Sequence, residues 1–303
     1  MHKLSIVILT HNESDLLKDC LESVKTLQAE IIVVDCGSSD NSVEVAKKFG
    51  ATVYSRLNNP MMNVNKNFAF TKATGEWILN LDADEQLNPE LIKEIQLVLE
   101  QNPNVNGYWI PRKNIIFGKW IEHTGWYPDY QLRLFRRNNG KYAGQLVHEA
   151  LIVEGKSAYL SSPFFHLNYV SVSQFLEKTI TNYTHNEANF LIKQGKHVSS
   201  MDAVRMPFRE FINRYLAQQG YKDGLHGLVL SLLMANYHFI VFCLIWEKQD
   251  FSDPNPQHVF PSFLTTYRRM GKEFQYWILT ALMDVQKNKL QKVFYRLRRK
   301  LQL

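Results

Sequence analysis

The stretch Trp77-Ile78-Leu79-Asn80-Leu81-Asp82-Ala83-Asp84 is a short apolar run that ends in two carboxylates. Such runs are typical of buried parallel strands, and α/β sheets bind ligands at the carboxyl ends of those strands. Carboxylates suit Mg²⁺ or Mn²⁺, which usually keep several waters and take substrate phosphates as further ligands. Asn88 and Pro89 predict the cap and first residue of the next helix, which leaves Asp82 and Asp84 without a capping role. The stretch therefore predicts a metal held between protein and diphosphate; the alternative is an acidic pair that only caps a helix.

Apolar runs and segments of helical periodicity alternate through the first hundred residues. Runs rich in β-branched residues predict buried parallel strands, and apolar residues every three or four positions predict amphipathic helices. Right-handed crossovers would assemble these strands into a parallel sheet with helices on both faces, so we expect an α/β fold. Besides strand 77–81, we predict strands at 4–9, 30–35 and 52–54, and helices at 16–27, 42–49 and 64–72.

The pattern changes after Pro103. We predict strands at 108–116 and 130–135, followed by a long helix at 173–194. From about residue 200 the chain becomes amphipathic and then strongly apolar, which predicts a mainly helical region. We therefore expect one domain at 1–200 and a helical extension at 201–303 that associates with a membrane or forms an oligomer.

The charge of the chain indicates an anionic partner. The 303 residues carry a formal net charge of +6, and positive charge of this kind favours association with anions. Nucleic acid is not favoured, because the sequence has no helix-turn-helix, zinc-finger or RNP-type motif. The C-terminal end carries seven cations and no acid among them, which fits the anionic headgroups of a membrane surface better. These cations are Lys287, Lys289, Lys292, Arg296, Arg298, Arg299 and Lys300.

The cysteines and the N-terminus point to the cytoplasm. Cys20, Cys36 and Cys243 are far apart, odd in number and without zinc-site spacing, so we expect reduced thiols. Residues 1–4 lead directly into the first predicted strand, so we expect no signal peptide.

Polar residues follow three of the predicted strands. The segment 10–13 follows the first strand, 35–40 follows the second, and Asp82 with Asp84 follows the fourth; Lys66 would pass beside them. The first strand is not followed by the Gly-x-Gly-x-x-Gly of dinucleotide-binding folds, and the chain has no Walker A motif. A nucleotide held by acids and a metal remains as the interpretation.

Three stretches together resemble the family 2 glycosyltransferases: residues 5–13, 32–40 and 75–85. Residues 126–137 and 147–149 are similar to the subgroup of lipopolysaccharide-core β-1,4-glucosyltransferases, and the resemblance fades by about residue 246. It implies a GT-A fold, a nucleotide-sugar donor and inversion at the sugar. In these terms residues 1–103 would form the nucleotide-sugar half and 104–200 the acceptor half of the catalytic domain.

The resemblance also implies a donor site. Asp35 would bind the base, Asp82 would reach the ribose or assist the metal, Asp84 would ligate the metal, and Lys66 would neutralise the diphosphate. The alternative for Asp35 is an aspartate that forms a turn before Gly-Ser-Ser. The nucleoside pocket would be lined by Thr10, Asn12 or Glu13.

An inverting enzyme needs a base across the sugar from the metal. Relatives place an acid where this chain has Glu149, which is therefore the first candidate, and Asp129 is the second. The structural alternative for Glu149 is a surface glutamate paired with Arg133 or Arg136. His148 would orient the base or bind the acceptor.

Four further side chains have two interpretations each. His166 would complete the metal shell, or it is an ordinary buried histidine. Trp126, Arg133 and Arg136 would bind an acceptor that is both sugar-like and anionic, since aromatic faces stack on sugars and guanidinium groups bind phosphates. Their alternative is packing in the core and at its rim.

Three C-terminal segments have membrane character. Residues 208–216 are amphipathic, 224–246 are strongly apolar, and 290–301 carry an apolar stripe flanked by the basic cluster. For 224–246 we place shallow insertion first, a buried or oligomeric helix second and a span third. A lipid-linked acceptor at the cytoplasmic leaflet would account for all three.

We expect an inverting, metal-dependent glycosyltransferase, peripheral to the inner face of the cell membrane. It would move a hexose, with glucose from UDP-glucose favoured by the subgroup, to a lipopolysaccharide core or similar glycan. The competing interpretations are a GT-A-fold sugar nucleotidyltransferase and a non-catalytic scaffold that binds membranes and partners.

Overall fold

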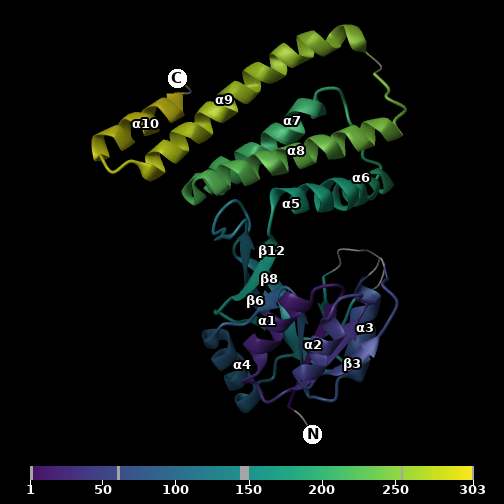
Figure 1. The fold of residues 1–303 in the computed structure, drawn as a ribbon. Coiled ribbons are helices and arrows are strands. Elements are labelled where there is room, and N and C mark those ends of the chain that lie inside the picture. Colours follow the sequence, from purple (N-terminus) through teal and green to yellow (C-terminus); the bar gives the residue numbers. More distant parts are fainter. Residues whose placement is uncertain (1–2, 60–61, 144–149, 254, 302–303) are drawn as a thin grey trace. The chain divides into compact units, whose positions relative to one another are not determined.

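The computed structural model describes residues 3–59, 62–143, 150–253 and 255–301. The chain forms two compact units (Figure 1). The first contains Met1–Ile115 and Tyr127–Asn168, and the second contains Ile116–Trp126 and Tyr169–Leu303.

The first unit is built on a mixed sheet whose order is β3-β2-β1-β4-β8-β6-β12-β5. The first four strands are parallel, β8 pairs antiparallel with β4 and β6, and β12 pairs antiparallel with β5. Every residue of β1 is buried, as expected for a central strand covered on both faces. The strands are β1 (Leu4–Thr10), β2 (Glu30–Asp35), β3 (Thr52–Ser55), β4 (Trp77–Asp82), β5 (Glu85–Gln86), β6 (Gly107–Ile116), β8 (Asp129–Arg136) and β12 (Phe164–Tyr169). Short strands are β7 (Lys119–Trp120), β9 (Gly140–Lys141), β10 (Ile152–Val153) and β11 (Ser157–Tyr159).

Helices cover both faces of this sheet. Helices α1 (Ser14–Val24), α2 (Ser42–Lys48) and α4 (Pro89–Gln101) pack on one face, and α3 (Met62–Lys72) packs on the other. Asn88 caps α4 through a bond from the Leu91 amide (2.7 Å) to its side-chain oxygen, as its place before a proline predicts. The expected α/β class, with a parallel set of strands covered by helices on both faces, is confirmed.

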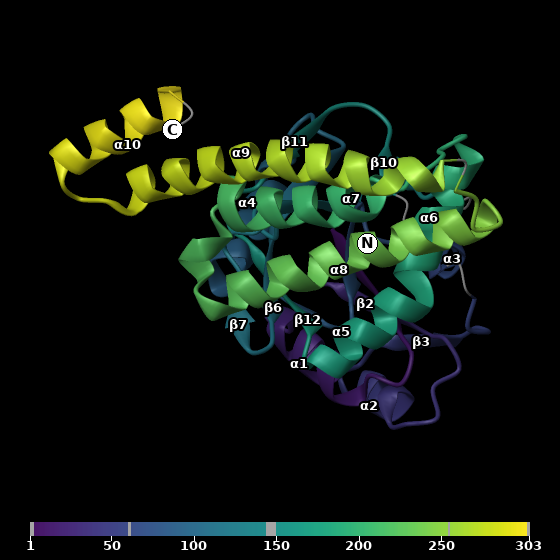
Figure 2. The same cartoon turned by 90° about the horizontal axis from the view of Figure 1, so that it is seen from above.

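The second unit is helical. Helices α5 (Val172–Lys178) and α6 (Thr184–Lys193) are joined by a π-helical turn and together form the predicted long helix. Helix α8 (Leu225–Lys248) lies alongside α6 and α7 (Asp202–Phe211) (Figure 2). By length and composition α8 could cross a membrane, but 33% of its most apolar window is buried, and the core helix of a soluble protein passes the same test.

The last two helices form a hairpin. Helix α10 (Lys289–Leu301) packs against α9 (Val259–Val285). The sequence pattern predicted α10 but not the 27-residue α9.

The boundary between the units differs from the one expected near residue 200. Tyr169 and Phe175 bury their rings in a cluster with Ile116, Ile121 and Leu230. This apolar packing places the predicted long helix, and the segment 116–126, in the helical unit.

Candidate active site

Asp82, at the end of β4, is neutralised by two buried cations. Its Oδ1 lies 2.6 Å from Lys66 Nζ and its Oδ2 lies 2.7 Å from Arg133 Nη2. Burial by itself would raise the Asp82 pKa, but the charges of Lys66 and Arg133 outweigh it and hold that pKa far below its usual range. Burial likewise opposes the charge of Lys66, yet Asp82 raises the Lys66 pKa. Both oxygens of Asp82 are therefore used by the protein, which favours assistance over direct metal ligation.

Asp84 and His166 lie together, as the metal interpretation requires. Their Oδ2 and Nε2 atoms are 3.4 Å apart, and the pairing of β12 with β5 brings them together. His166 Nδ1 lies 2.7 Å from the side-chain oxygen of Asn114. Because that oxygen only accepts, Nδ1 donates to it and a neutral ring keeps the Nε2 lone pair for a metal.

These two groups fit a divalent cation. Asp84 Oδ1 is buried and has no hydrogen-bond partner within the described part of the chain. No cluster of three or more His, Cys, Asp or Glu side chains that would form a full shell occurs among the described residues. Mg²⁺ and Mn²⁺ are commonly held by one or two carboxylates, with waters and substrate phosphates as the other ligands. Asp84 and His166 would be the protein's share of such a shell.

A buried carboxylate that the sequence analysis left without a role, Glu85, extends this site. Its side chain is fully buried; Oε1 accepts from Arg133 Nη2 at 2.5 Å, and Oε2 accepts from the Asp82 amide at 3.0 Å. Burial raises the Glu85 pKa, and Arg133 only partly offsets this. Glu85 is adjacent to the Asp82/Asp84 pair in sequence, but only the fold shows that it points inward.

Arg133 has a different role from the predicted one. It is 4% exposed and binds Asp82 and Glu85, so its guanidinium group is not presented to an acceptor. Burial opposes its charge, yet Glu85 and Asp82 raise its pKa. Arg133 instead holds the two carboxylates in place.

Arg136 lies at the wrong end of the sheet for an acceptor role. It pairs across the strands with Trp77, where β4 begins, whereas Asp82 is where β4 ends. Trp77 and Asp82 are five residue steps apart along the strand, which separates them by about 16 Å. Arg136 also binds Glu76 (2.6 Å) and the Pro103 carbonyl (2.8 Å), so packing explains it.

Asp129, the second candidate base, is bound by three side chains. Arg112 donates to Oδ2 from Nε at 2.8 Å and Nη2 at 2.5 Å, Asn114 donates to the same oxygen at 3.2 Å, and Gln131 donates to Oδ1 at 2.7 Å. Burial would raise the Asp129 pKa, but Arg112 lowers it. A carboxylate so stabilised is a weak base. Glu149 and His148 lie outside the described residues, so their roles stay predictions.

The ends of β1 and β2 form the other side of this sheet edge. Register places Leu9 beside Asp82 and Thr10 beside Asp35. Thr10 is buried, and its hydroxyl oxygen has no hydrogen-bond partner within the described ranges. The Asp35 carboxylate accepts from the amides of Gly37 (3.3 Å) and Ser38 (3.2 Å), which is the turn-forming alternative. Its binding of a base stays a prediction.

Asn12 and Glu13 connect these two strand ends. The backbone of Asn12 has φ +56°. The Asn12 side-chain oxygen accepts from the Ser39 backbone amide (2.7 Å), and the Asn12 backbone amide donates to Ser38 Oγ (2.9 Å). The Glu13 amide donates to Ser42 Oγ at 3.2 Å. The loops are thus joined at the same edge as Asp82.

Trp126 belongs to the helical unit. Its ring meets Tyr169 edge-on, with centroids 6.5 Å apart, and the Arg214 guanidinium lies 5.6 Å from it. These contacts are those of the packing alternative, and acceptor binding by Trp126 stays a prediction.

Comparison with known proteins places this geometry in a family. Residues 5–154 match the family model "Glycosyl transferase family 2". An uncharacterized glycosyltransferase of Rickettsia felis is 26% identical over 261 residues, covering 82% of this chain and 91% of the relative. The lipopolysaccharide core biosynthesis glycosyltransferase LpsC of Rhizobium meliloti is 26% identical over 252 residues, covering 81% and 92%.

Among solved structures, the mannosyltransferase PcManGT of Pyrobaculum calidifontis, in complex with GDP-Man and Mn²⁺, is 14% identical. The match covers 99% of this chain and 84% of the mannosyltransferase chain, with a TM-score of 0.45. From the family match and the named relatives, this chain belongs to glycosyl transferase family 2 and is a glycosyltransferase.

Proposed function

We propose that the chain is an inverting, metal-dependent transferase that moves a hexose from a UDP-sugar, with UDP-glucose first, to a lipopolysaccharide core or other surface glycan. The observation that supports it best is the Asp84–His166 pair, with a buried carboxylate oxygen free of hydrogen bonds within the described chain. The acceptor class is supported by the name of LpsC.

The charges around Asp84 favour a cation. Lys66 contacts Asp82, Arg133 contacts both Asp82 and Glu85, and Arg112 lies 3.9 Å from Glu85. Asp82 and Glu85 share those cations, so Asp84 is left without a lysine or arginine partner in the described chain. A cation bound by Asp84 and His166 would neutralise charge on a departing diphosphate.

The protein's own groups would do the remaining work. Lys66 and Arg133 keep Asp82 ionised and fixed, and Asn114 keeps His166 Nε2 directed at Asp84. Asp35, Thr10, Asn12 and Glu13 are proposed to receive the nucleoside. A carboxylate on the far side of the sugar, Glu149 before Asp129, would take the acceptor proton.

We also propose that the enzyme works in the cytoplasm, peripheral to the inner face of the membrane, on a lipid-linked or anionic acceptor. The support is the apolar stripe of α10 with its cations, a combination found in interfacial helices.

Calorimetry with a panel of nucleotide sugars, with and without Mn²⁺, tests the donor proposal. We expect Mn²⁺-dependent binding of one donor, which Asp84→Asn loses and which Asp19→Asn, an exposed acid on α1, keeps. Glu149→Gln should bind the donor and lose transfer. Absence of Mn²⁺-dependent binding for every donor would refute the proposal, and unchanged transfer by Glu149→Gln would move the base to Asp129.

A further inference from the structure

Three aromatic rings lie together on the surface of the first unit. Trp109 is on β6, Tyr130 is on β8 and Tyr159 is on β11. The rings of Tyr130 and Tyr159 meet edge-on, with centroids 5.0 Å apart. The rings of Trp109 and Tyr159 are nearly parallel, at 23°, with centroids 6.4 Å apart. We call these three residues the aromatic cluster.

The register of the sheet places all three rings on one face. Trp109 pairs with Tyr159, and Pro111 pairs with Tyr130. Paired residues lie side by side on the same face, and residues two apart along a strand share a face. That face is the one on which α3 packs, because Trp109 lies against the apolar core that contains the buried residues of α3.

The aromatic cluster begins next to the candidate active site. Tyr130 directly follows Asp129, the second candidate base, at the start of β8. Lys66, one of the two buried cations of the site, reaches the sheet from α3, on the same face as the rings. From Pro111, the partner of Tyr130, to Trp109 the strand covers about 7 Å. The rings therefore lead away from the proposed reaction centre along the same face.

The rings are fixed in place but not covered. Trp109 is half-buried, and its Nε1 donates to Ser157 Oγ at 3.2 Å. Tyr130 is 40% exposed and Tyr159 is 64% exposed. The hydroxyl groups of these two tyrosines make no hydrogen bond within the described part of the chain, so both remain able to donate and to accept. Exposed aromatic surface of this kind marks a binding surface.

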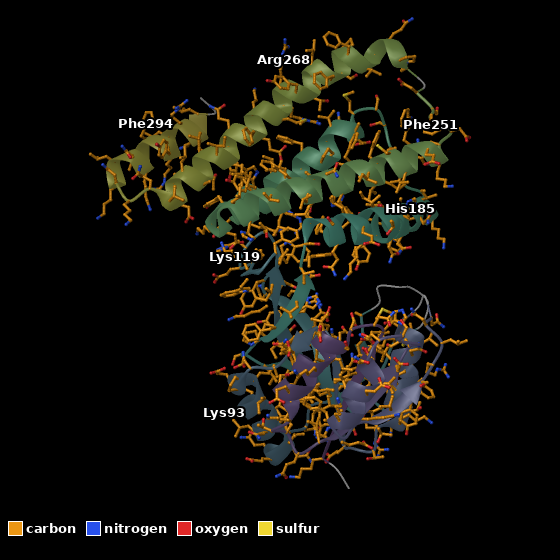
Figure 3. The ribbon with its side chains drawn as sticks, in the orientation of Figure 1. Lys93, Lys119, His185, Phe251, Arg268 and Phe294 are labelled. Carbon is orange, nitrogen blue, oxygen red and sulfur yellow. The ribbon has the colours of Figure 1, made fainter. Side chains whose placement is uncertain are left out.

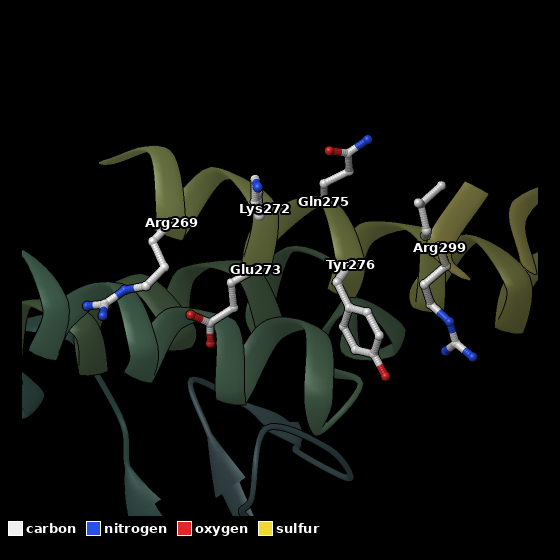
Figure 4. A pocket seen from close by; sticks show the side chains of 7 residues that line it. Arg269, Lys272, Glu273, Gln275, Tyr276 and Arg299 are labelled. Carbon is white, nitrogen blue, oxygen red and sulfur yellow. The ribbon is translucent and has the colours of Figure 1, made fainter. Parts of the chain in front are cut away.

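Exposed aromatic rings of the helical unit have different surroundings. Tyr276 lines a cavity of about 330 Å³ together with Arg269, Lys272 and Arg299 (Figure 4). The guanidinium carbon of Arg299 lies 5.1 Å from the centre of the Tyr276 ring. Phe294, which projects from α10 (Figure 3), belongs to an apolar stripe and has no polar atom in its side chain. Neither ring offers an uncovered face together with a free hydroxyl from a second tyrosine.

We propose that the aromatic cluster binds a sugar ring of the acceptor glycan, away from the hydroxyl group that reacts. The C–H groups on one side of a sugar ring pack against aromatic faces, and its hydroxyls can bond to the free hydroxyls of Tyr130 and Tyr159. A stable protein interface needs about 800 Å² from each partner, which is more than three partly exposed rings of roughly 200 Å² each provide. The inference rests on the proposed function, because it takes the acceptor to be a glycan.

Calorimetric titration of the full chain with an oligosaccharide released from a lipopolysaccharide core tests the inference. We expect saturable binding, which Tyr159→Ala should weaken roughly two- to tenfold, the range for one aromatic contact. The double variant Tyr130→Ala, Tyr159→Ala should weaken it roughly tenfold or more. Tyr159→Phe keeps the ring and should retain more binding than Tyr159→Ala. The matched control is Tyr276→Ala, an exposed tyrosine of the helical unit, which should bind as the wild type does.

Three results would overturn the inference: no binding of the oligosaccharide by the wild type, full binding by the double variant, or equal weakening in Tyr276→Ala. A change in the oligomeric state of the double variant without oligosaccharide, measured by light scattering, would also overturn it, because the rings would then form a protein interface. Slow hydrolysis of nucleotide sugars by the wild type is measured in parallel. Oligosaccharide binding without hydrolysis of any nucleotide sugar would count against the proposed donor chemistry and leave the glycan site standing.

Discussion

The two regions that gather positive charge use it in opposite ways. At the carboxyl edge of the sheet, Lys66 and Arg133 are buried and each contacts a carboxylate. In the α9–α10 hairpin, Lys272 is exposed and Arg269, Lys272 and Arg299 have no ion-pair partner in the described chain. Burying a charge is costly unless it is paired, so the first set must be internally neutralised, and only the second is free to bind an anion without breaking a pair.

The largest effect on the free energy of unfolding should come from removing one of the two buried cations, Lys66 and Arg133. Arg133→Met would remove the cation that contacts both Asp82 and Glu85, leaving Lys66 beside Asp82 and Arg112 3.9 Å from Glu85, and loss of one partner from a buried pair costs about 3–5 kcal/mol. Urea unfolding should show that loss, whereas Arg136→Met, in a partly exposed pair with Glu76, should cost about 1 kcal/mol. Equal losses would remove the distinction between the two arginines.

A smaller effect is expected from removing the side chain that orients His166, the proposed metal ligand. Asn114→Ala removes the oxygen that orients His166, and loss of such an orienting group typically weakens metal binding about 10–100-fold. Mn²⁺ titration monitored by donor binding measures this, with Asn106→Ala as control, because Asn106 bonds to the Glu154 carbonyl. Unchanged Mn²⁺ affinity in Asn114→Ala would argue against His166 as a ligand.

The helical unit provides a pH-dependent prediction. Burial opposes ionisation of Glu210, but its bond to His238 and the charge of Arg214 lower its pKa to about 2. Because the folded pKa is below the unfolded one, Glu210 stabilises the fold above about pH 4.3, and that contribution is lost as pH falls toward 2. Glu210→Gln should therefore destabilise the protein by ~1–3 kcal/mol at pH 6 and by much less at pH 2.5.

Thermal unfolding across this pH range gives the measurement. The control is Glu247→Gln, which changes an exposed glutamate of α8 and should have the same small effect at every pH. A Glu210→Gln deficit that stayed constant with pH would show that the carboxylate charge is not the cause.

The smallest effect should come from the hairpin surface. Arg298→Gln or Leu297→Ser should change the free energy of unfolding by less than about 0.5 kcal/mol, because both side chains are exposed. Urea unfolding without vesicles checks this. A larger loss would mean that the stripe packs within the protein, and it would weaken the contrast between the two regions.

Residue pattern was sufficient wherever a property depended on neighbours in the chain. The apolar runs predicted β1, β2 and β4, and Asn88-Pro89 predicted the start of α4. The carboxyl ends of these three strands lie at one edge of the sheet because parallel strands run in the same direction. Asp35 and Asp82 could therefore be placed together from sequence alone.

The positions of Arg133, Arg136 and His166 could not be predicted, because they depend on the antiparallel strands and no local sequence pattern specifies the register of those strands. Because β8 runs opposite to β4, Arg136 lies beside the first residue of β4, and Arg133 turns inward to Asp82 and Glu85. The pairing of β12 with β5 joins His166 to Asp84 across 82 residues of chain. The sequence by itself determined the family, the sheet edge and the acidic pair; the tertiary structure decided which charges neutralise each other there and which remain free, because burial and pairing depend on contacts between distant segments.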